Sequence, residues 1–478
     1  MKKNRLLFGI LCLVLLISLL PWPASATLGG ISDPVTEPDG SVIAGSHSID
    51  AQVPLWGSNK MLETSAAAIL YETNTDTLVY AWNPDTPRYP GALVKMMTGF
   101  LAAELGNMDA VITVTEEALS ALPLYTSTLK LRAGEIVTLK QLMYALFVGG
   151  ANDAAVVISH HIGGSEEQFV QMMNDRAKEM GCTSTTFTNS TGIHNNNQMT
   201  TARDVAKFLE IASENEVFMD FFSSTFYTFP ETNLSPARES MLTTNYLMTP
   251  GMEFYYDERV TGGRTGTTSD NKRCLAITAD NGNLSYIVII LEAIPIIAED
   301  GYTAKRFGNL EEAATLLDLG YSNYDIFQVL MDTDITNQYT VTNGANAVAV
   351  GPTTEIRALL PKTATRYDLE MRYLLNESSI VAPIEIGQPL ATMQVWYENV
   401  CVAQGPVVAR NAVKEYVPQQ DRTGGTDTDD LIMILTVIGV ILGVILCVLG
   451  VMFVIQLARR AGARAQHRRR RQSRRRSR

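Results

Sequence analysis

A run of 25 residues, 431–455, contains no charged side chain. At about 1.5 Å per residue, a helix over this run is ~37 Å long, enough to cross a hydrocarbon core of ~30 Å. Three aspartates lie within residues 427–430, and eleven arginines follow within residues 459–478. Because basic flanks stay on the cytoplasmic side, we expect a single membrane span at residues 431–457 with the acidic side outside. A buried core helix is the alternative interpretation.

Both ends of the chain indicate an exported, anchored protein. Residues 1–26 have the pattern of a secretory signal peptide, with three early basic residues, an apolar stretch at 6–20 and the small-x-small site Ala24-Ser25-Ala26. An uncleaved N-terminal anchor is the alternative. The arginine-rich tail, residues 458–478, is expected in the cytoplasm against anionic lipid headgroups, with nucleic-acid binding as the alternative.

The charge balance narrows the classes of partner. The chain has 38 basic and 50 acidic residues, a net charge of −12. Without the fourteen cations near its two ends, the remainder holds 24 basic and 50 acidic residues, a net charge of −26. A region this acidic is a poor binder of nucleic acid.

The cysteines do not form a recognisable framework. Cys182, Cys274 and Cys401 are the cysteines between the leader and the span, an odd number at wide spacing. That pattern argues against a disulfide scaffold, and no Cys-x-x-Cys or His-x-x-x-His spacing indicates a metal site. We expect neither a metal nor an organic cofactor.

Residues 55–320 read as a layered α/β domain. Residues 65–73 and 77–82 alternate like paired strands, and β-rich runs at 274–278 and 284–291 flank a hairpin turn. Helical patterns lie between these blocks and after them, at 91–105, 139–148, 154–162, 165–181 and 311–319. Strands at both ends with helices between them predict a sheet covered by helices.

Residues 325–417 have a different pattern. Short β-prone segments at 338–342, 347–350 and 392–397 are separated by Gly, Pro and Asn, which predicts a small all-β domain. The polar residues 418–430 are then expected to form a linker to the span.

The expected catalytic site is inferred from three short motifs and from their order along the chain. A serine acyl-transfer site needs a nucleophile, a nearby base, donors for the oxyanion and a cation for the substrate carboxylate. Ser-x-x-Lys at a helix start supplies the first two, because residues three apart share a helix face. In this chain residues 89–98 read Tyr-Pro-Gly-Ala-Leu-Val-Lys-Met-Met-Thr, residues 149–155 read Gly-Gly-Ala-Asn-Asp-Ala-Ala, and residues 263–269 read Gly-Arg-Thr-Gly-Thr-Thr-Ser.

These segments resemble the Pro-Ala-Ser-Leu-Thr-Lys-Leu-Met-Thr, Ser-Gly-Asn-Asp-Ala and Lys-Thr-Gly motifs of the low-molecular-mass penicillin-binding proteins, the serine-type D-alanyl-D-alanine carboxypeptidases. Residues 187–193 and 200–204 look like further landmarks of that family, and residues 351–414 are similar to its β-rich C-terminal domain. The resemblance covers about residues 60–415. It implies an α/β penicillin-binding, β-lactamase-like domain, an antiparallel sheet with a helical cluster, and then a small all-β domain. It also implies a bacterial cell-membrane location and peptidoglycan stem peptides ending in D-Ala-D-Ala as partners.

The positions at which this chain differs from the family's motifs are the ones expected to carry the catalytic groups. The nucleophile position is Ala92, which has no nucleophilic atom. The second-motif serine is replaced by Gly150, and the third-motif lysine by Arg264, which keeps a cation but cannot lend a proton as lysine can. The other motif positions expected at the site are kept, namely Lys95 as the base, Asn152 in the second motif, and Thr265, Gly266 and Thr267 for substrate binding. The backbone N–H groups of Ala92 and Thr267 are expected to form the oxyanion pocket.

Three other hydroxyls, those of Ser127, Ser269 and Thr98, are alternative nucleophiles. Ser127 begins a literal Ser-x-x-Lys, but residues 131–134 read as strand and turn rather than helix. Ser269 also begins a Ser-x-x-Lys, directly after the Arg-Thr-Gly strand, and Thr98 lies one turn past Lys95, pointing into the core. Inert packing is the alternative role for Lys95, and helix capping is the alternative for Asn152 and Asp153.

Three hypotheses of function follow. The first is a membrane-anchored, non-cleaving homologue that binds stem peptides ending in D-Ala-D-Ala or scaffolds cell-wall enzymes. The second is an active D-Ala-D-Ala carboxypeptidase with an unrecognised nucleophile. The third is a structural or partner-binding protein whose cleft holds no ligand.

Overall fold

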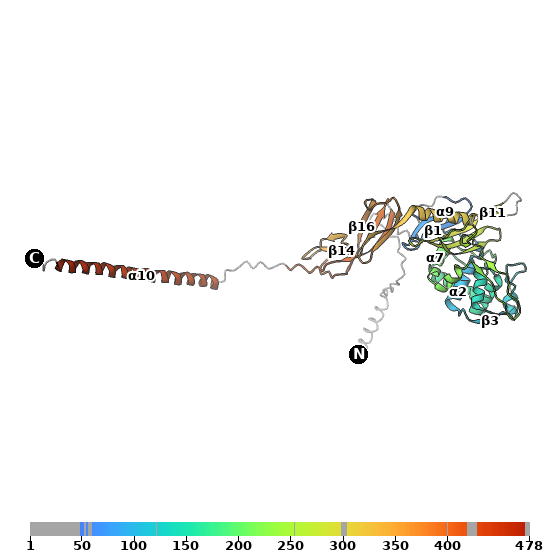
Figure 1. Ribbon diagram of the computed structural model, residues 1–478, viewed down its shortest axis with the longest axis horizontal. Coiled ribbons are helices and arrows are strands. Elements are labelled where there is room, and N and C mark those ends of the chain that lie inside the picture. The colour runs from blue at the N-terminus through green and yellow to red at the C-terminus, as the bar shows by residue number, and fades with distance from the viewer. Residues whose placement is uncertain are drawn as a thin grey trace, which may run out of the picture. The chain divides into compact units, whose positions relative to one another are not determined.

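The computed structural model of the chain describes residues 48–51, 54–55, 60–120, 122–252, 254–297, 304–398, 400–417 and 428–473, and for 304, 305, 428–430 and 458–473 it gives the backbone (Figure 1). The expected signal peptide, residues 1–26, lies outside the described residues, as do residues 418–427 of the expected linker.

The first domain is organised around a five-stranded antiparallel sheet in the order β2-β1-β9-β8-β7. β1 pairs with β2 across a hairpin and with β9 on its other side, where Ile69 lies opposite Ile289. Strands from the beginning and from the later part of the domain therefore share one sheet, as expected. The strands are β1 Ala67–Glu72, β2 Thr77–Trp82, β7 Val260–Thr267, β8 Arg273–Asp280 and β9 Ser285–Ala293.

Helices cover both faces of this sheet. Alternate side chains of β1 point to opposite faces, so that Ile69 packs in one core and Leu70 in the other. α9 (Gly308–Asn323) covers the Leu70 face, and α7 (Ala202–Ser213) packs on the Ile69 face together with the helical region (Figure 1). The mixed α/β class expected from the sequence is confirmed.

The helical region contains the expected helices and three more. The elements that match expectation are η1 Gly91–Leu93 with α2 Val94–Leu105, α4 Leu139–Phe147, α5 Asn152–Gly163 and α6 Glu166–Glu179. α7 and α8 (Glu216–Phe222) were not predicted as helices, and neither was the short α3, Glu116–Ser120. Small elements complete the domain, namely β3 Val111–Thr113, β4 Ile136–Thr138, β5 Phe226–Tyr227, β6 Met241–Leu242, η2 Tyr246–Met248, β10 Ile296–Ile297 and β11 Ala304–Arg306.

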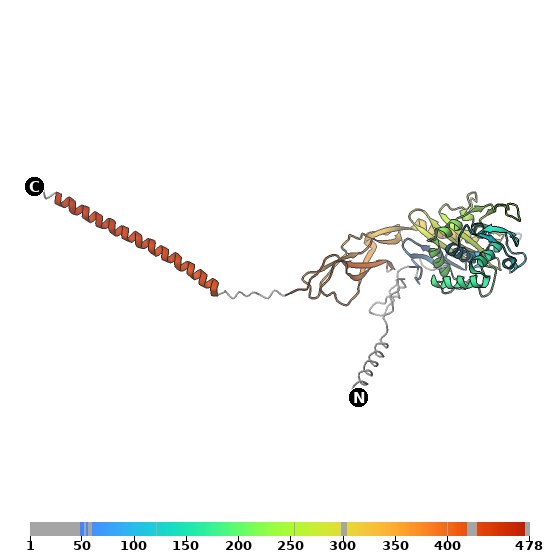
Figure 2. The same cartoon turned by 90° about the horizontal axis from the view of Figure 1, so that it is seen from below.

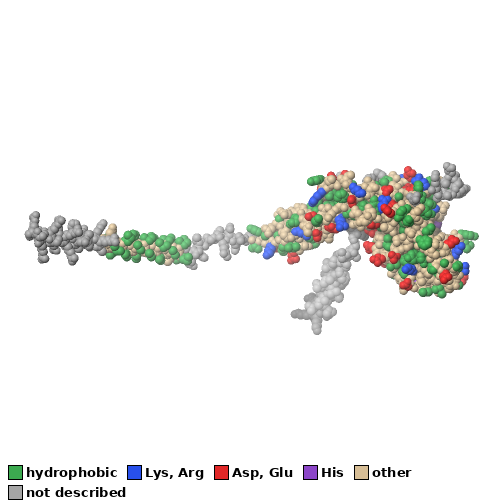
Figure 3. Space-filling view, viewed as in Figure 1, with side chains coloured by type: hydrophobic (Ala, Val, Ile, Leu, Met, Phe, Trp, Pro, Cys, Tyr) green, Lys and Arg blue, Asp and Glu red, His purple; other side chains and the backbone are tan. Residues whose placement is uncertain are grey.

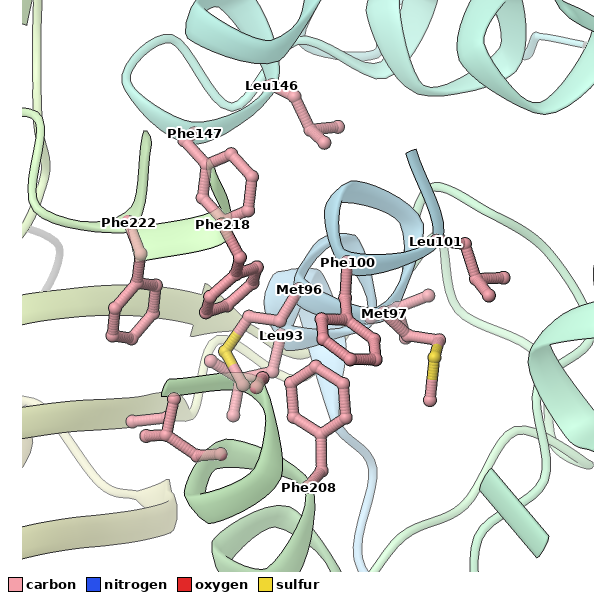
Figure 4. Packing of buried hydrophobic residues seen from close by; sticks show 14 of the residues in the cluster. Leu93, Met96, Met97, Phe100, Leu101, Leu146, Phe147, Phe208, Phe218 and Phe222 are labelled. Atoms are coloured by element: carbon pink, nitrogen blue, oxygen red, sulfur yellow. The ribbon is translucent and has the colours of Figure 1, made fainter. Parts of the chain in front are cut away.

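α2 is the buried centre of the helical region. All its residues from 94 to 102 are buried, and Phe100 meets Phe208 of α7 and Phe218 of α8 edge to face, with ring centroids 5.6 and 5.9 Å apart (Figure 4). Aromatic pairs in this geometry contribute about 0.5–1.5 kcal/mol beyond their buried area. The packing holds α2 in place, and with it the residues at its start.

The second domain is all-β, as expected. β12 pairs with β15, and a five-stranded antiparallel sheet has the order β13-β14-β18-β17-β16. The strands are β12 Tyr324–Leu330, β13 Asn337–Tyr339, β14 Val348–Pro352, β15 Ile356–Pro361, β16 Leu369–Leu375, β17 Pro389–Tyr397 and β18 Val400–Ala409, with η3 at Arg366–Asp368.

A second unit contains Val341–Asn346, Val381–Pro383 and, among the described residues that follow, 413–417 and 428–473. The Ala382 N–H donates to the Thr342 carbonyl at 3.0 Å, and the Tyr416 N–H donates to the Asn343 carbonyl at 2.7 Å. These bonds hold three short segments side by side before the last helix.

The last helix, α10, spans Thr428–Ser473 and is continuous (Figure 2). It begins three residues inside the expected linker, because residues 428–430 are already helical. Its segment Leu431–Leu457 is long and apolar enough to cross a membrane, and its apolar side chains are exposed (Figure 3).

Candidate functional site

The three motifs meet at one cleft, where η1 and α2 begin, α5 begins and β7 ends. Two adjoining hollows of about 260 and 390 Å³ make up the cleft. Ala92, Ser127, Gly150 and Thr267 line both hollows. The first hollow is also lined by Lys95 and Asn152, and the second by Arg264, Thr265 and Gly266, so all eight residues selected from the sequence lie in the cleft.

Glycines allow these backbones to approach closely. Gly91 has φ +54°, and a Cβ there would lie 2.7 Å from the Thr267 carbonyl oxygen. A Cβ at Gly266 would lie 3.0 Å from the Pro90 carbonyl oxygen and 3.1 Å from the Ala92 nitrogen. Contact this close brings the start of α2 against the end of β7, so the expected oxyanion donors, the N–H groups of Ala92 and Thr267, lie on adjacent backbones.

Lys95 is a buried lysine one helical turn beyond Ala92. Its side chain donates to Asn152 Oδ1 at 2.5 Å and to the Thr191 carbonyl oxygen, both uncharged acceptors. Burial, with Arg264 as a nearby positive charge, holds the pKa of Lys95 well below its usual value. Packing does bury Lys95, but the residue also lines the cleft, and its terminal nitrogen is hydrogen-bonded to Asn152 of the second motif.

The second motif joins Lys95 to a loop. Asn152 donates from Nδ2 to Thr126 Oγ1 while its Oδ1 accepts from Lys95, so it does not cap α5, whose N-cap residue Ala151 has no side-chain bond. Asp153 accepts the N–H groups of Leu129 and Leu131, each at 2.9 Å. Burial raises the pKa of Asp153.

This loop corrects one expectation. Residues 131–134 were expected to be strand and turn, but residues 126–132 are irregular, and the N–H groups of Leu129 and Leu131 donate to the Asp153 carboxylate instead of to a neighbouring strand. The turn expected at residues 133–134 is present.

Arg264 reaches from β7 toward the second motif. It is 5% exposed, and its Nη1 donates to the Phe147 carbonyl oxygen at 2.6 Å. Its Nε is buried without a hydrogen-bond partner among the described residues. Desolvation lowers the pKa of Arg264 to about 10, so the guanidinium stays charged at neutral pH.

The second hollow contains residues that the motifs did not indicate. Arg273 donates from Nη1 to Thr267 Oγ1 at 3.0 Å and lies 5.4 Å from the Phe307 ring centroid. Arg273 Nε and Asn309 Oδ1 are buried without a partner in the described part of the chain. The hairpin spacing is the signal that could have found Arg273, since it lies directly opposite Thr267 in the β7–β8 register.

The lining is positively charged. Lys95, Arg264 and Arg273 line the two hollows, whereas no Asp or Glu is among the described residues that line them. His194, which the motifs also did not indicate, lines the first hollow and meets Tyr89 edge to face at 4.7 Å. The cleft therefore favours an anionic ligand.

The alternative hydroxyls have different surroundings. Ser127 and Ser269 line the cleft, but neither begins a helix. Thr98 is fully buried and donates to the Ser190 carbonyl oxygen at 2.7 Å. The Thr98 hydroxyl is thus buried in the core with its hydrogen already donated to Ser190. The two serines lack the helical turn that would place their lysines one turn away.

Two other kinds of site can be examined in the described residues. No three His, Cys, Asp or Glu side chains there gather in a way that could hold a metal ion. Cys182, Cys274 and Cys401 are buried free thiols, and burial raises the pKa of Cys182 and of Cys274 to about 12.

Comparison with known proteins places this cleft in a family. The sequence model of the D-alanyl-D-alanine carboxypeptidase peptidases matches residues 58–294, and that of the penicillin-binding protein 5 C-terminal domain matches residues 324–415. The D-alanyl-D-alanine carboxypeptidase DacF of Bacillus subtilis is 26% identical over 363 residues, covering 75% of this chain and 88% of the relative. DacA of Haemophilus influenzae is 25% identical over 382 residues, covering 78% of this chain and 91% of the relative.

Solved structures agree with the sequence comparison. The crystal structure of penicillin-binding protein 5 from Haemophilus influenzae matches with a TM-score of 0.61 at 25% identity, covering 75% of this chain and all of that chain. The fold of DacD from Francisella tularensis matches with a TM-score of 0.59 at 21% identity, covering 77% of this chain and 98% of that chain. The chain belongs to the D-alanyl-D-alanine carboxypeptidase family and carries the C-terminal domain of penicillin-binding protein 5.

Proposed function

We propose that this protein binds peptidoglycan stem peptides ending in D-Ala-D-Ala without cleaving them, while anchored in the bacterial cell membrane. The observation that carries the proposal is Ala92 at the nucleophile position of a cleft that is otherwise assembled. A methyl group cannot attack a carbonyl, so the acyl-enzyme route is closed there. Losing a nucleophile of this kind lowers turnover by on the order of 10⁶ in a serine protease.

The charges of the cleft support binding of a carboxylate. Arg264 and Arg273 line the second hollow, and each has a buried Nε without a partner among the described residues. A planar guanidinium can hold a carboxylate through two parallel hydrogen bonds. Because Thr267 accepts from Arg273 through its hydroxyl oxygen, its own hydroxyl hydrogen stays available to a ligand.

The ends of the chain support the location. α10 contains one candidate span at Leu431–Leu457, followed by the arginine-rich tail. By the positive-inside rule the tail lies in the cytoplasm and both folded domains lie outside, where peptidoglycan is. Scaffolding of cell-wall enzymes is compatible with the same arrangement.

Binding and turnover can be measured on one sample. Full-length protein in detergent is titrated with N-acyl-L-lysyl-D-Ala-D-Ala and with the C-terminal amide of that peptide, and released D-alanine is assayed in parallel. We expect saturable binding of the peptide, at least about tenfold weaker binding of the amide, and no D-alanine. D-alanine release would contradict the proposal, and absence of saturable binding would leave a structural role.

Arg273 provides a sharper version of this test. A hydrogen bond to a charged group contributes about 1.5–3 kcal/mol, so Arg273→Gln is expected to weaken binding of the free-acid peptide by about ten- to hundredfold. Binding of the amide should change little, because the amide has no charge to lose. The exposed Arg132, changed to Gln, is the matched control and should leave both affinities unaltered.

An active enzyme is the second candidate, since Ser127 and Ser269 line the cleft. In that case either serine becomes acylated by a β-lactam, and replacing that serine by alanine abolishes the adduct. A partner-binding protein with an empty cleft, the third candidate, gives neither an adduct nor peptide binding.

A further inference from the structure

Gly150 and Arg264 lie against each other across the cleft. An ideal Cβ on Gly150 would lie 3.0 Å from Arg264 Nη2, and the next nearest atoms to it belong to the same guanidinium. This separation is tighter than ordinary van der Waals contact. A side chain at residue 150 would therefore require the end of Arg264 to shift by a few tenths of an ångström.

The guanidinium is not free to move aside. Its Nη1 is bonded to the carbonyl oxygen of Phe147, the last residue of α4, and the side chain is 5% exposed. Displacing it would strain that bond in a buried side chain whose Nε already has no hydrogen-bond partner among the described residues. Gly150 also has φ +65°, a conformation that a serine adopts only with strain.

We propose that Gly150 and Arg264 are one compensated substitution, in which the guanidinium fills the second-motif side-chain position and acts as the ligand-binding cation there. Glycine at 150 is then required by arginine at 264, because any larger residue meets Nη2. Lysine has no second terminal nitrogen, so a lysine at 264 leaves room for a side chain at 150. The cleft has been rebuilt around Arg264 rather than having lost two groups independently.

The position of Arg264 has a consequence for the ligand. The guanidinium lies beside Gly150, and Gly150 also lines the first hollow with Ala92 and Lys95. Arg264, which lines the second hollow, thus lies against a residue that lines both halves of the cleft. This part of the inference rests on the proposed function: the free carboxylate of the peptide binds at the boundary between the hollows, and affinity requires glycine and arginine together.

A four-protein cycle tests the pair. The full-length protein in detergent is compared with Gly150→Ser, Arg264→Lys and the double variant by thermal melting. Gly282→Ser is the matched control, since Gly282 has φ +87° with nothing within 4 Å of a Cβ, and it reports backbone strain alone. We expect serine at 150 to lower Tm more than the control does when residue 264 is arginine, and no more than the control when it is lysine.

Equal losses of Tm from serine in the two backgrounds would overturn the proposal, as would failure of both serine variants to fold. Failure of Gly150→Ser alone to fold, with a folded double variant, would support it.

The same four proteins are titrated with N-acyl-L-lysyl-D-Ala-D-Ala, and Gly150→Ser alone is expected to lose at least about tenfold in affinity. If the parent does not bind this peptide, the proposed function fails while the melting cycle still decides on the pair. If the parent binds the peptide and the losses in Tm are additive, the proposed function holds, but the proposed compensation between Gly150 and Arg264 is wrong.

Discussion

Lys95 is buried among uncharged acceptors, and its low pKa has a consequence for stability. Its side chain is 2% exposed, and burial holds its pKa below the ordinary value of 10.5. Between the lowered pKa and 10.5 the unfolded chain binds more protons than the folded one. The free energy of unfolding therefore rises with pH across that window, by up to about 1.4 kcal/mol per pH unit, and levels off above it.

Replacing Lys95 by methionine should remove this dependence. We expect the Tm of the parent minus the Tm of Lys95→Met to increase as the pH is raised from 7 toward 10, measured by thermal melting in matched buffers. Lys140→Met, at an exposed lysine, is the control and should give a flat difference over the same range. A flat or falling difference for Lys95→Met would show that burial does not lower the pKa of Lys95.

For single residues, the sequence predicted which positions line the site, but it did not predict which side chains contact each other there. The order of the motifs was enough to select Ala92, Lys95 and Arg264, because their spacing along the chain is diagnostic. It could not show that Arg264 fills the space beside Gly150, because that contact depends on side-chain direction across residues 114 positions apart. For Arg273 the missing information was the exact register of a hairpin.

At the scale of elements, three glycine contacts hold the cleft together. Gly91 and Gly266 join the start of α2 to the end of β7, and Gly192, with φ +77°, brings the loop after α6 against Gly91. A Cβ on Gly192 would overlap the Gly91 carbonyl oxygen. The shape of the cleft thus depends on backbone contacts that tolerate no side chain.

Gly192→Ala is expected to be strongly destabilising. The positive φ alone costs about 1–2 kcal/mol, and the overlap with backbone adds to that because backbone cannot rotate away. Gly282→Ala has the cost of the positive φ without the overlap with backbone, since the space around Gly282 is open. Urea unfolding should give a clearly larger loss for Gly192→Ala, and equal losses would show that the Gly91 contact is not tight.

Elements were predictable where the pattern was local. The β1–β2 hairpin and α6 follow from alternation and from a cap at Ser165, whose side chain accepts the Gln168 N–H. α8 was missed because its seven residues are too few to show a helical period, and three buried phenylalanines hold it in place. The loop at 126–132 was misread as partly strand because its amide partner, Asp153, lies more than twenty residues away in sequence.

At the scale of the whole molecule, α10 is the candidate anchor for both folded domains. We expect a protein ending at Val417 to move to the soluble fraction when cells are broken and fractionated. A protein lacking only residues 459–478 should stay with the membranes, because the apolar segment remains. Finding the protein that ends at Val417 still in the membrane fraction would mean that another part of the chain holds it there.

The central claim is that this cleft binds but does not react, and covalent labelling tests it most directly. Full-length protein in detergent is incubated with a labelled penicillin and its intact mass is measured, beside an Ala92→Ser, Gly150→Ser, Arg264→Lys triple variant. We expect an unchanged mass for the parent and one bound penicillin on the triple variant, in which the nucleophile, hydroxyl and lysine are restored together. A penicillin adduct on the parent would contradict it, and would identify the protein as an active enzyme with a nucleophile other than residue 92.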